Sequence, residues 1–249
     1  MHHHSISMDP TCRFYCYRKN RDAFNYNVAK ADKIELVFFD MDGVLADTIS
    51  SWKHIHDYFE TSNERSVDEY LRGNIDDLEF IKRDVLLWKE NGKLTRKDTL
   101  QDILYDVPLI EGAEKCLSFL KNNNIKTAIV SAGLDILAEK VARELSIDYV
   151  FANGVKIDDD GRLTGEGILQ VQLIYKDKNV TNLAEKLKIP LEKCAAVGNS
   201  CFDIPMFETC GVGIAFNPAD DCVREAADII IEGNDLSQIL PVIKPFIQT

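Results

Sequence analysis

The chain has 249 residues, of which 45% are hydrophobic, so it is long enough to bury a sizeable core in one domain or two. Its formal net charge of −12 disfavours binding to a nucleic-acid backbone, because such affinity comes largely from lysine and arginine side chains. No apolar run approaches the roughly 18 to 20 residues that a membrane-spanning helix requires. These properties predict a globular protein whose partner is a small molecule rather than a nucleic acid or a membrane.

Residues 1–33 precede the first predicted strand. They start with MHHHS, which we interpret as the remnant of an expression tag rather than as a secretion signal. Cys12 and Cys16 are four residues apart without further metal ligands nearby, and the seven cysteines of the chain form no repeated CxxC pattern. Reduced thiols in the cytoplasm are therefore expected. An arm at residues 9–33 that packs on a second subunit would make a homo-oligomer, a question that the sequence leaves open.

From residue 34 onward, short apolar runs alternate with amphipathic stretches in which apolar residues recur three and four positions apart. The predicted strands are 34–39, 125–130, 194–198, 211–216 and 228–232. Alternation of strands and helices indicates a parallel sheet covered on both faces. The predicted fold class is therefore α/β, with a doubly wound, Rossmann-like core.

Residues 49–108 interrupt this alternation. They contain helical patterns punctuated by Gly73 and Gly92, and no convincing strand. We therefore predict a core of residues 34–48 and 109–249 with a helical cap of residues 49–108 inserted after the first strand. Because ligands bind beyond the carboxyl ends of parallel strands, a cap that leaves the core there is expected to cover the site as a lid.

The acidic run at residues 158–160 lies in a second departure from the alternation. A calcium loop is excluded by spacing, since Lys156 occupies the first ligand position and no glutamate follows at the required distance. A hairpin that turns at Asp160 and Gly161 is predicted instead.

Two aspartates, Asp40 and Asp42, end the first predicted strand with only Met41 between them. Alternate residues of an extended chain share a face, so both carboxylates can face one group. Carboxylates this close repel each other, and burying even one without a partner is costly. The pair therefore predicts a cation or a reacting group, against the simpler alternative of one helix cap and one solvated acid.

The end of the second core strand offers an anion site. Ser131 follows the apolar run, and the backbone N–H groups of Ala132 and Gly133 are expected to open a helix, which suits a bound anion. Lys176 lies near the start of a later helix and would add a positive charge. The simpler alternatives are a serine that only caps its helix and a lysine exposed to solvent.

A tight turn follows the strand at 194–198. Asn199 and Asp203 are four residues apart across this turn, an arrangement that suits oxygen ligands of Mg²⁺ or groups that support such ligands. The carboxylates, the anion site, the lysine and this loop all lie at predicted strand ends. We therefore expect them to meet at one edge of the sheet.

These residues resemble the motifs of the haloacid dehalogenase (HAD) superfamily, most closely its phosphoserine-phosphatase-like branch. The similar segments are DMDGVLADT at 40–48, VSAG at 130–133, Lys176 with Lys178 as a second candidate, and GNSCFDIPMF at 198–207. The resemblance covers residues 34–245.

The resemblance implies a phosphatase that forms an aspartyl-phosphate. Asp40 would attack phosphorus in line, which divides a difficult hydrolysis into two easier steps. Asp42 would protonate the leaving alcohol and then deprotonate the attacking water. Ser131 and Lys176 would bind the phosphoryl oxygens.

The resemblance also implies Mg²⁺ as the cofactor, held by Asp40, the backbone carbonyl of Asp42 and the loop that carries Asn199 and Asp203. The family usually has an aspartate at the position of Asn199. The loss of one negative charge predicts weaker metal binding. Phe202 likewise replaces a frequent asparagine in this loop.

The implied substrate is a small phosphate monoester, with phosphoserine favoured. Ile49 stands where the branch has an acidic residue for the substrate's ammonium group, and Asp47 is a nearby substitute. Arg83 is the candidate for binding the substrate carboxylate, against the alternative of a solvated helix face. His54 and His56 are interpreted as surface residues of the cap.

Two other functions compete with this interpretation. A sugar phosphomutase of the same superfamily would share DGVLADT and a helical cap, but its fourth motif usually carries adjacent acids where this chain has Asn199 and Ser200. A catalytically weakened binding or regulatory protein would keep the fold while Asn199 and Phe202 reduce activity. A metal-free dehalogenase is disfavoured, because that branch does without the second aspartate, Asp42.

Overall fold

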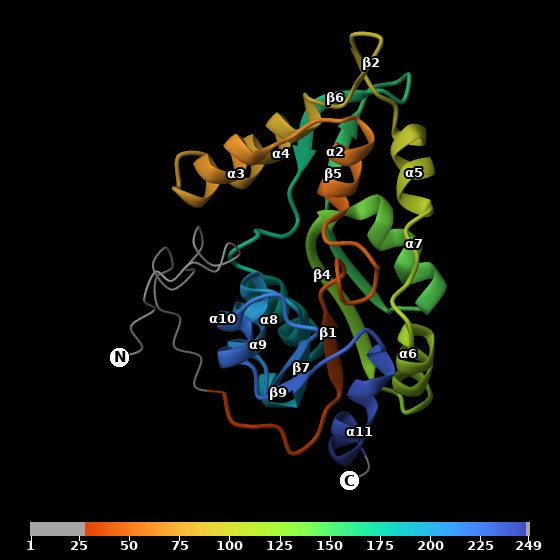
Figure 1. Cartoon of the computed structure of the whole chain (residues 1–249). Helices are drawn as coiled ribbons and strands as arrows, with labels where there is room; N and C mark the ends of the chain where they lie inside the picture. Colours follow the sequence, from red (N-terminus) through yellow and green to blue (C-terminus); the bar gives the residue numbers. More distant parts are fainter. Residues whose placement is uncertain (1–27, 248–249) are drawn as a thin grey trace.

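The computed structural model describes residues 28–247, so the expectations for Cys12, Cys16 and the start of the chain lie outside the described part. Figure 1 shows a sheet with helices packed around it and a second group of helices, α2 to α4, beyond one end of its strands. Within residues 28–247, no helix is long and apolar enough to cross a lipid bilayer.

A seven-stranded sheet forms the core, with the strand order β6-β5-β4-β1-β7-β8-β9. The strands are β1 (Leu36–Phe39), β4 (Lys126–Leu134), β5 (Tyr149–Ile157), β6 (Leu163–Ile168), β7 (Cys194–Gly198), β8 (Val212–Phe216) and β9 (Ile229–Ile231). All neighbours pair in parallel except β5 and β6, which are antiparallel. The predicted doubly wound α/β fold is confirmed.

The central strand β1 consists of the four apolar residues LVFF, all of them buried. Successive side chains of a strand point to opposite faces, so Val37 and Phe39 enter one hydrophobic cluster while Leu36 and Phe38 enter the other. Truncating Phe39 to alanine would cost about 3 to 5 kcal/mol of stability, as is usual for a buried phenylalanine. The strand therefore joins both halves of the core.

Helices cover both faces of the sheet. The cluster that contains Phe39 includes residues of α6 (Ala113–Asn122), α7 (Asp135–Leu145), η3 (Leu236–Ile239) and α11 (Leu240–Ile243). The opposite cluster includes residues of α8 (Asp177–Leu187), η2 (Cys201–Asp203), α9 (Ile204–Thr209) and α10 (Asp221–Ala226). Two further short turns are η1 (Leu191–Lys193) and η4 (Lys244–Phe246).

The segment between β1 and α6 is mainly helical. It contains α2 (Ser51–Tyr58), α3 (Glu64–Leu71), α4 (Asp77–Val85) and α5 (Lys97–Tyr105), with the short strands β2 (Lys89–Glu90) and β3 (Lys93–Leu94). The expectation that this segment has no strand was wrong. Asn91 and Gly92 both have positive φ, 51° and 77°, and thus form the tight turn of a small hairpin. The division of the chain into cap and core at residues 49 and 108 stays a prediction.

The strand β5 belongs to two different pairings. Its start, from Tyr149 to Asn153, pairs with β4, whereas its end pairs with β6 from Gly154 onward. The turn between β5 and β6 has Gly161 at φ 77° and a hydrogen bond of 2.8 Å from the Asp158 N–H to the Arg162 carbonyl, which confirms the predicted hairpin. This hairpin extends beyond the ends of the parallel strands and lies beside α4 (Figure 1).

Candidate active site

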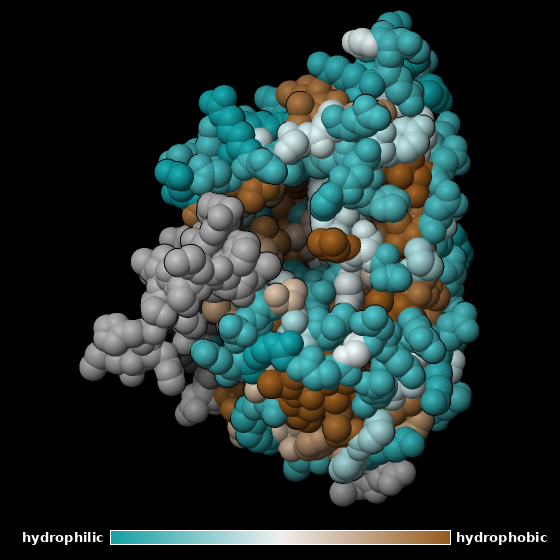
Figure 2. Space-filling view, viewed as in Figure 1, coloured by the Kyte–Doolittle hydropathy of each residue, from teal (hydrophilic) through white to brown (hydrophobic). Residues whose placement is uncertain are grey.

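The site lies where β1, β4 and β7 end together. Phe39 pairs with Ile129 on one side and with Val197 on the other, so the three strands run in register up to this edge. The residues that follow, from Asp40 and Asn199 onward, therefore emerge next to each other. Figure 2 shows the molecular surface hollowed between the upper and lower parts of the protein, with apolar residues in the wall of the hollow.

A buried cluster of two carboxylates and one lysine lies at this edge. Lys176 immediately precedes α8, and its side chain is only 2% exposed. Its Nζ lies 2.9 Å from Asp40 Oδ1 and 2.7 Å from Asp203 Oδ1. The alternative of a solvent-exposed Lys176 was wrong. Lys178 is exposed and donates to Gln172 instead, so it is not part of this cluster.

The charges in this cluster do not balance, because Asp42 adds a third carboxylate near the single lysine. Burial raises the pKa of Asp40 to about 7, with repulsion by Asp203 adding to the effect and Lys176 opposing it. Burial alone would lower the pKa of Lys176, but Asp203 and Asp40 raise it above its usual value. An additional positive charge would therefore relieve a real electrostatic cost at this site.

Asp42 is held by Ser51, the first residue of α2. The backbone N–H and the hydroxyl of Ser51 both donate to Asp42 Oδ2, at 2.9 and 3.0 Å. Among the described residues, Asp42 Oδ1 is buried without a hydrogen-bond partner. Burial raises the pKa of Asp42, and the bonds from Ser51 partly oppose this shift. The role of Ser51 was not predicted from the sequence. The two adjacent serines of TISSW were a signal, because only one of them is needed to cap the helix.

The segment of Ser131, Ala132 and Gly133 is a continuation of β4 and not a helix start. The helix α7 begins only at Asp135, so the prediction of N–H groups that open a helix was wrong. The strand continues because Leu134 still pairs with Asn153 of β5, and residue 133 is a glycine because a Cβ there would lie 2.7 Å from Asp42 Oδ2. The Gly133 N–H donates to Ser131 Oγ at 3.1 Å, and Ser131 is only 2% exposed.

The turn after β7 is organised by Asp203. Its Oδ2 accepts hydrogen bonds from the backbone N–H groups of Asn199 and Ser200, at 2.9 and 3.0 Å, while its Oδ1 faces Lys176. The side chain of Asn199 lies against Gly43, where an added Cβ would meet its Nδ2 at 2.1 Å. Gly43 has φ 75°, a conformation that favours glycine. The first and fourth motifs thus contact each other directly.

The donor set is compatible with Mg²⁺. In the described part of the chain, no group of three or more His, Cys, Asp or Glu side chains is arranged as a metal site. Mg²⁺ nevertheless requires few carboxylates, since it keeps several waters and uses the substrate phosphate as a further ligand. The buried, unpartnered Oδ1 of Asp42 and the excess negative charge around Asp40 both suit a small divalent cation.

Two predicted positions in the helical segment have partners within that segment. Arg83 forms ion pairs with Glu69 and, through Nε at 2.8 Å, with Glu79. Its role in binding the substrate carboxylate stays a prediction. His56 is 3% exposed, with Nε2 at 3.3 Å from Asp84 Oδ2, so its interpretation as a surface residue was wrong. Its partner Asp84 lies 28 residues further along the chain.

His54 and Ile49 lie near the first motif. Burial is the main cause of the raised pKa of Asp42, and His54 is close enough to lower that pKa by its charge. Ile49 is 86% exposed, an unusual environment for a large aliphatic side chain.

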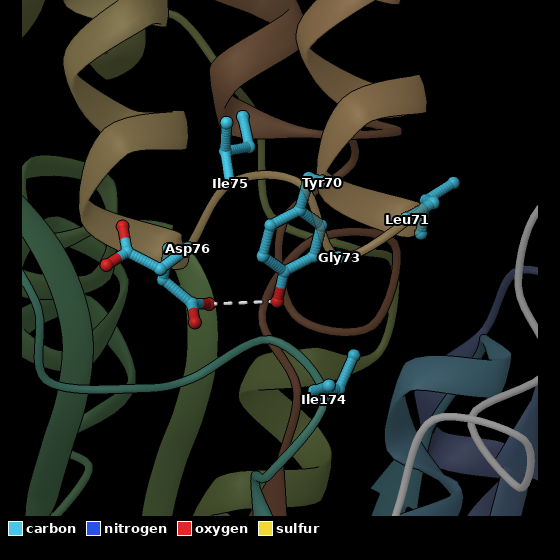
Figure 3. A pocket seen from close by; sticks show the side chains of 7 residues that line it. Tyr70, Leu71, Gly73, Ile75, Asp76 and Ile174 are labelled. Carbon is cyan, nitrogen blue, oxygen red and sulfur yellow. Dashed lines mark hydrogen bonds between the residues drawn. The ribbon is translucent and has the colours of Figure 1, made fainter.

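A cavity of about 300 Å³ lies between the α3–α4 connection and the segment that leads to Lys176. Its lining residues are Tyr70, Leu71, Gly73, Ile75, Asp76, Asp77 and Ile174. Figure 3 shows the Tyr70 ring and Ile174 facing this space from two different segments. The Tyr70 hydroxyl donates to Asp77 Oδ1 at 3.0 Å, and the Leu173 N–H donates to the same oxygen. These bonds join the two segments next to the lysine.

Comparison with known proteins gives consistent results. The family model of haloacid dehalogenase-like hydrolases matches residues 34–211. A phosphoserine phosphatase of Methanocaldococcus jannaschii is 33% identical over 233 residues, which cover 85% of this chain and 99% of that protein. A phosphoserine phosphatase of Archaeoglobus fulgidus is 32% identical over 84% of this chain, which spans 60% of that longer protein.

Solved structures show the same similarity. A substrate-bound phosphoserine phosphatase complex has a TM-score of 0.72 and 30% identity, with 85% of this chain and 99% of the other covered. A structure of a phospho-aspartyl intermediate analogue of phosphoserine phosphatase gives the same TM-score, identity and coverage.

Proposed function

The chain belongs to the haloacid dehalogenase superfamily, in its phosphoserine-phosphatase-like branch, and is a phosphatase; from this premise we propose that it is an Mg²⁺-dependent phosphomonoesterase that prefers phosphoserine. The observation that carries the proposal is the buried cluster of Asp40, Lys176 and Asp203 beside the Asp42 carboxylate. Buried charges are costly to desolvate, and groups with strongly shifted pKa values are concentrated at functional sites.

In the first step, an Asp40 carboxylate oxygen attacks phosphorus, and the bond between phosphorus and the alcohol oxygen breaks. Lys176, at 2.9 Å from Asp40 Oδ1, favours the ionised form that the attack requires. The leaving oxygen takes a proton from Asp42. Because Asp42 Oδ2 accepts two hydrogen bonds from Ser51, we assign that proton to Oδ1.

In the second step, water attacks the aspartyl-phosphate and transfers its proton to Asp42, which restores the acid and frees Asp40. The raised pKa of Asp42 suits both roles, because it favours the protonated form that gives a proton to the leaving oxygen and makes the carboxylate a better base for water. The analogue structure of a similar phosphatase supports an intermediate of this kind.

The phosphoryl oxygens are bound by Ser131, Lys176 and the N–H groups of Ala132 and Gly133. Both the serine and the lysine are 2% exposed, so their interactions with an anion are little screened by water. The Gly133 N–H already points toward the Ser131 hydroxyl at 3.1 Å.

Mg²⁺ would be held by Asp40, the Asp42 carbonyl and the Asn199 amide, and when bound it supplies positive charge that offsets the charges of phosphate and nucleophile. Direct ligation by Asp203 stays a prediction. Its two oxygens already accept hydrogen bonds, and in this arrangement Asp203 orients Lys176 and the loop.

Phosphoserine is proposed as the substrate on the strength of the relatives. Arg83 stays the predicted contact for the substrate carboxylate, and Asp47 stays the predicted substitute for the acidic residue that Ile49 replaces.

The protein is further proposed to work in the reducing cytoplasm. Cys116, Cys194 and Cys210 are buried thiols that form no disulfide, which is the state expected there. Assembly into a homo-oligomer stays a prediction.

The test is phosphate release from L-phosphoserine and a panel of small phosphate monoesters, with and without Mg²⁺, with Asp40→Asn as the control. We expect metal-dependent release that selects phosphoserine and disappears in the variant. Equal activity on all esters would reject phosphoserine as the preferred substrate. Phosphate release that persists after chelation of Mg²⁺ would reject Mg²⁺ as the cofactor. A bisphosphate-activated isomerisation of a sugar phosphate would identify the phosphomutase instead.

A further inference from the structure

The carbonyl of Ala132 receives two hydrogen bonds from outside its own strand. The indole Nε1 of Trp52, in the first turn of α2, donates to it at 2.9 Å, and the Asn153 amide donates at 3.3 Å. The pairing of β4 with β5 shifts between Val130 and Leu134, so the regular ladder is interrupted at this carbonyl. Side chains therefore take over the role that a neighbouring strand usually has.

The two ends of the Ala132–Gly133 peptide point in opposite directions. The peptide bond is planar and trans, as all described peptide bonds are, so its C=O and N–H are antiparallel. With the carbonyl directed to Trp52 and Asn153, the N–H is directed to Ser131 Oγ at 3.1 Å. Trp52 thus fixes the direction of an N–H group that faces the proposed phosphate site.

This peptide also lies beside the acid of the reaction. A Cβ at Gly133 would stand 2.6 Å from Ser51 Oγ and 2.7 Å from Asp42 Oδ2. The neighbouring Leu134 N–H donates to Ser51 Oγ at 2.9 Å. Adjacent residues of α2, Ser51 and Trp52, therefore hold two consecutive peptides at the end of β4.

Trp52 is itself held in place by the interior of the helical segment. Its ring stacks on Trp88, with centroids 5.5 Å apart and an angle of 29° between the rings. Trp88 is fully buried, and its Nε1 donates to His56 Nδ1 at 3.2 Å. The indole of Trp52 thus has a rigid support and a single polar contact, to the active-site strand.

We propose that Trp52 is a positioning residue that holds the Ala132–Gly133 peptide with its N–H directed at the bound phosphoryl group. The inference rests on the proposed function, because it assigns a consequence to phosphate binding at that site. The anion site is then complete only when the α2 segment is docked on the core. A free peptide would readily turn its carbonyl, rather than its N–H, toward the phosphate and repel it.

The experiment compares Trp52→Phe with Trp88→Phe in the Mg²⁺-loaded protein. Both variants lose one indole N–H within the same stacked pair, but only the first removes a bond to the Ala132 carbonyl. We expect Trp52→Phe to lower kcat about tenfold and to weaken competitive inhibition by inorganic phosphate to a similar degree. Trp88→Phe is expected to change both quantities less than twofold, while its melting temperature falls at least as much.

A second measurement covers the case in which Trp52→Phe does not fold. In the Trp88→Phe background Trp52 is the sole tryptophan, so growth on the sulfur analogue 3-benzothienylalanine replaces this indole alone and keeps its shape while removing the N–H. The same tenfold losses are expected. Unchanged phosphate inhibition and kcat in the folded Trp52 proteins would overturn the inference. If the parent protein is inactive, the proposed function is rejected. Titration of inorganic phosphate into the parent and the variants then still tests whether Trp52 contributes to phosphate binding.

Discussion

The two sides of the site are built in different ways. On the core side, Asp40, Lys176 and Asp203 form a charged cluster from strand ends and a helix start. On the cap side, Ser51 and Trp52 contribute neutral hydrogen bonds to Asp42 and to the end of β4. In the proposed mechanism, the first side sets the charge that phosphate meets, and the second sets the direction of the acid and of a backbone donor. Charge and orientation are therefore supplied by separate parts of the chain.

The largest effect is expected at the nucleophile. Asp40→Asn removes the attacking oxygen, so phosphate release should fall by at least about 10³-fold. The asparagine keeps the shape and removes a buried charge, so the melting temperature should not fall. Steady-state release and thermal unfolding test both statements. Residual activity above a few per cent would assign the nucleophile to another residue.

The charged cluster on the core side is tested by replacing its lysine, Lys176. Lys176→Met leaves Asp40 and Asp203 buried without their ammonium partner, which should cost about 3 to 5 kcal/mol of unfolding free energy. Urea denaturation measures this cost.

The matched control for this variant is Lys178→Met, since Lys178 is exposed and should change stability by less than about 0.5 kcal/mol. Adding Asp203→Asn to Lys176→Met should recover part of the loss. If the two lysine variants are equally stable, the charged cluster has no stabilising cation.

The hydrogen bonds on the cap side are tested by replacing Ser51. Ser51→Ala removes the hydroxyl that donates to Asp42, and kcat should fall about tenfold, as expected for a misplaced acid. The bond from Ser51 lowers the pKa of Asp42, so its removal should raise that pKa further. Because the first step needs protonated Asp42, its rate in rapid-quench experiments should stay high to a more alkaline pH than in the parent.

Ser50→Ala provides the control for Ser51→Ala. Ser50 caps α2 through the Lys53 N–H and has no bond to Asp42, so its loss should reduce stability by about 1 kcal/mol and leave the pH profile in place. A shift of the profile in both variants would attribute it to the helix start as a whole.

A gain of function, and not a loss, is expected at the metal loop. Asn199→Asp adds one negative charge beside Gly43 and should tighten Mg²⁺ binding by about tenfold. Calorimetric titration of Mg²⁺ into both proteins measures the difference, and Gln238→Glu adds the same charge at an exposed position of η3, outside the metal loop, as a control for net charge. Equal affinities of the parent and Asn199→Asp would contradict the assignment of this amide to the metal.

The fold could be predicted because its signals are local. The apolar runs around Phe39, Val197 and Ile214 are strands that the sheet buries on both faces, and the structure has them within two residues of the expected ranges. β4 was predicted too short, since the residues after Val130 are small and polar and resemble a helix cap. The Asn91–Gly92 turn was a recognisable hairpin signal that the helical pattern around it obscured.

The site could be predicted only on its charged side. Asp40 and Lys176 belong to motifs with fixed spacing, whereas the bond from Trp52 to Ala132 joins residues 80 positions apart and leaves no pattern in the sequence. The ion pair of Arg83 with Glu69 on a neighbouring helix is another contact between separate segments that one sequence does not reveal.

The continuous strand β5 has a mechanical consequence for the lid. Its start is a member of the sheet, while its far end carries β6, where Gly167 packs so closely on Ile81 of α4 that an added Cβ would stand 2.4 Å from it. The helical segment is therefore joined to the sheet by β5 as well as by its two chain connections. We expect it to move over only a small amplitude relative to the sheet.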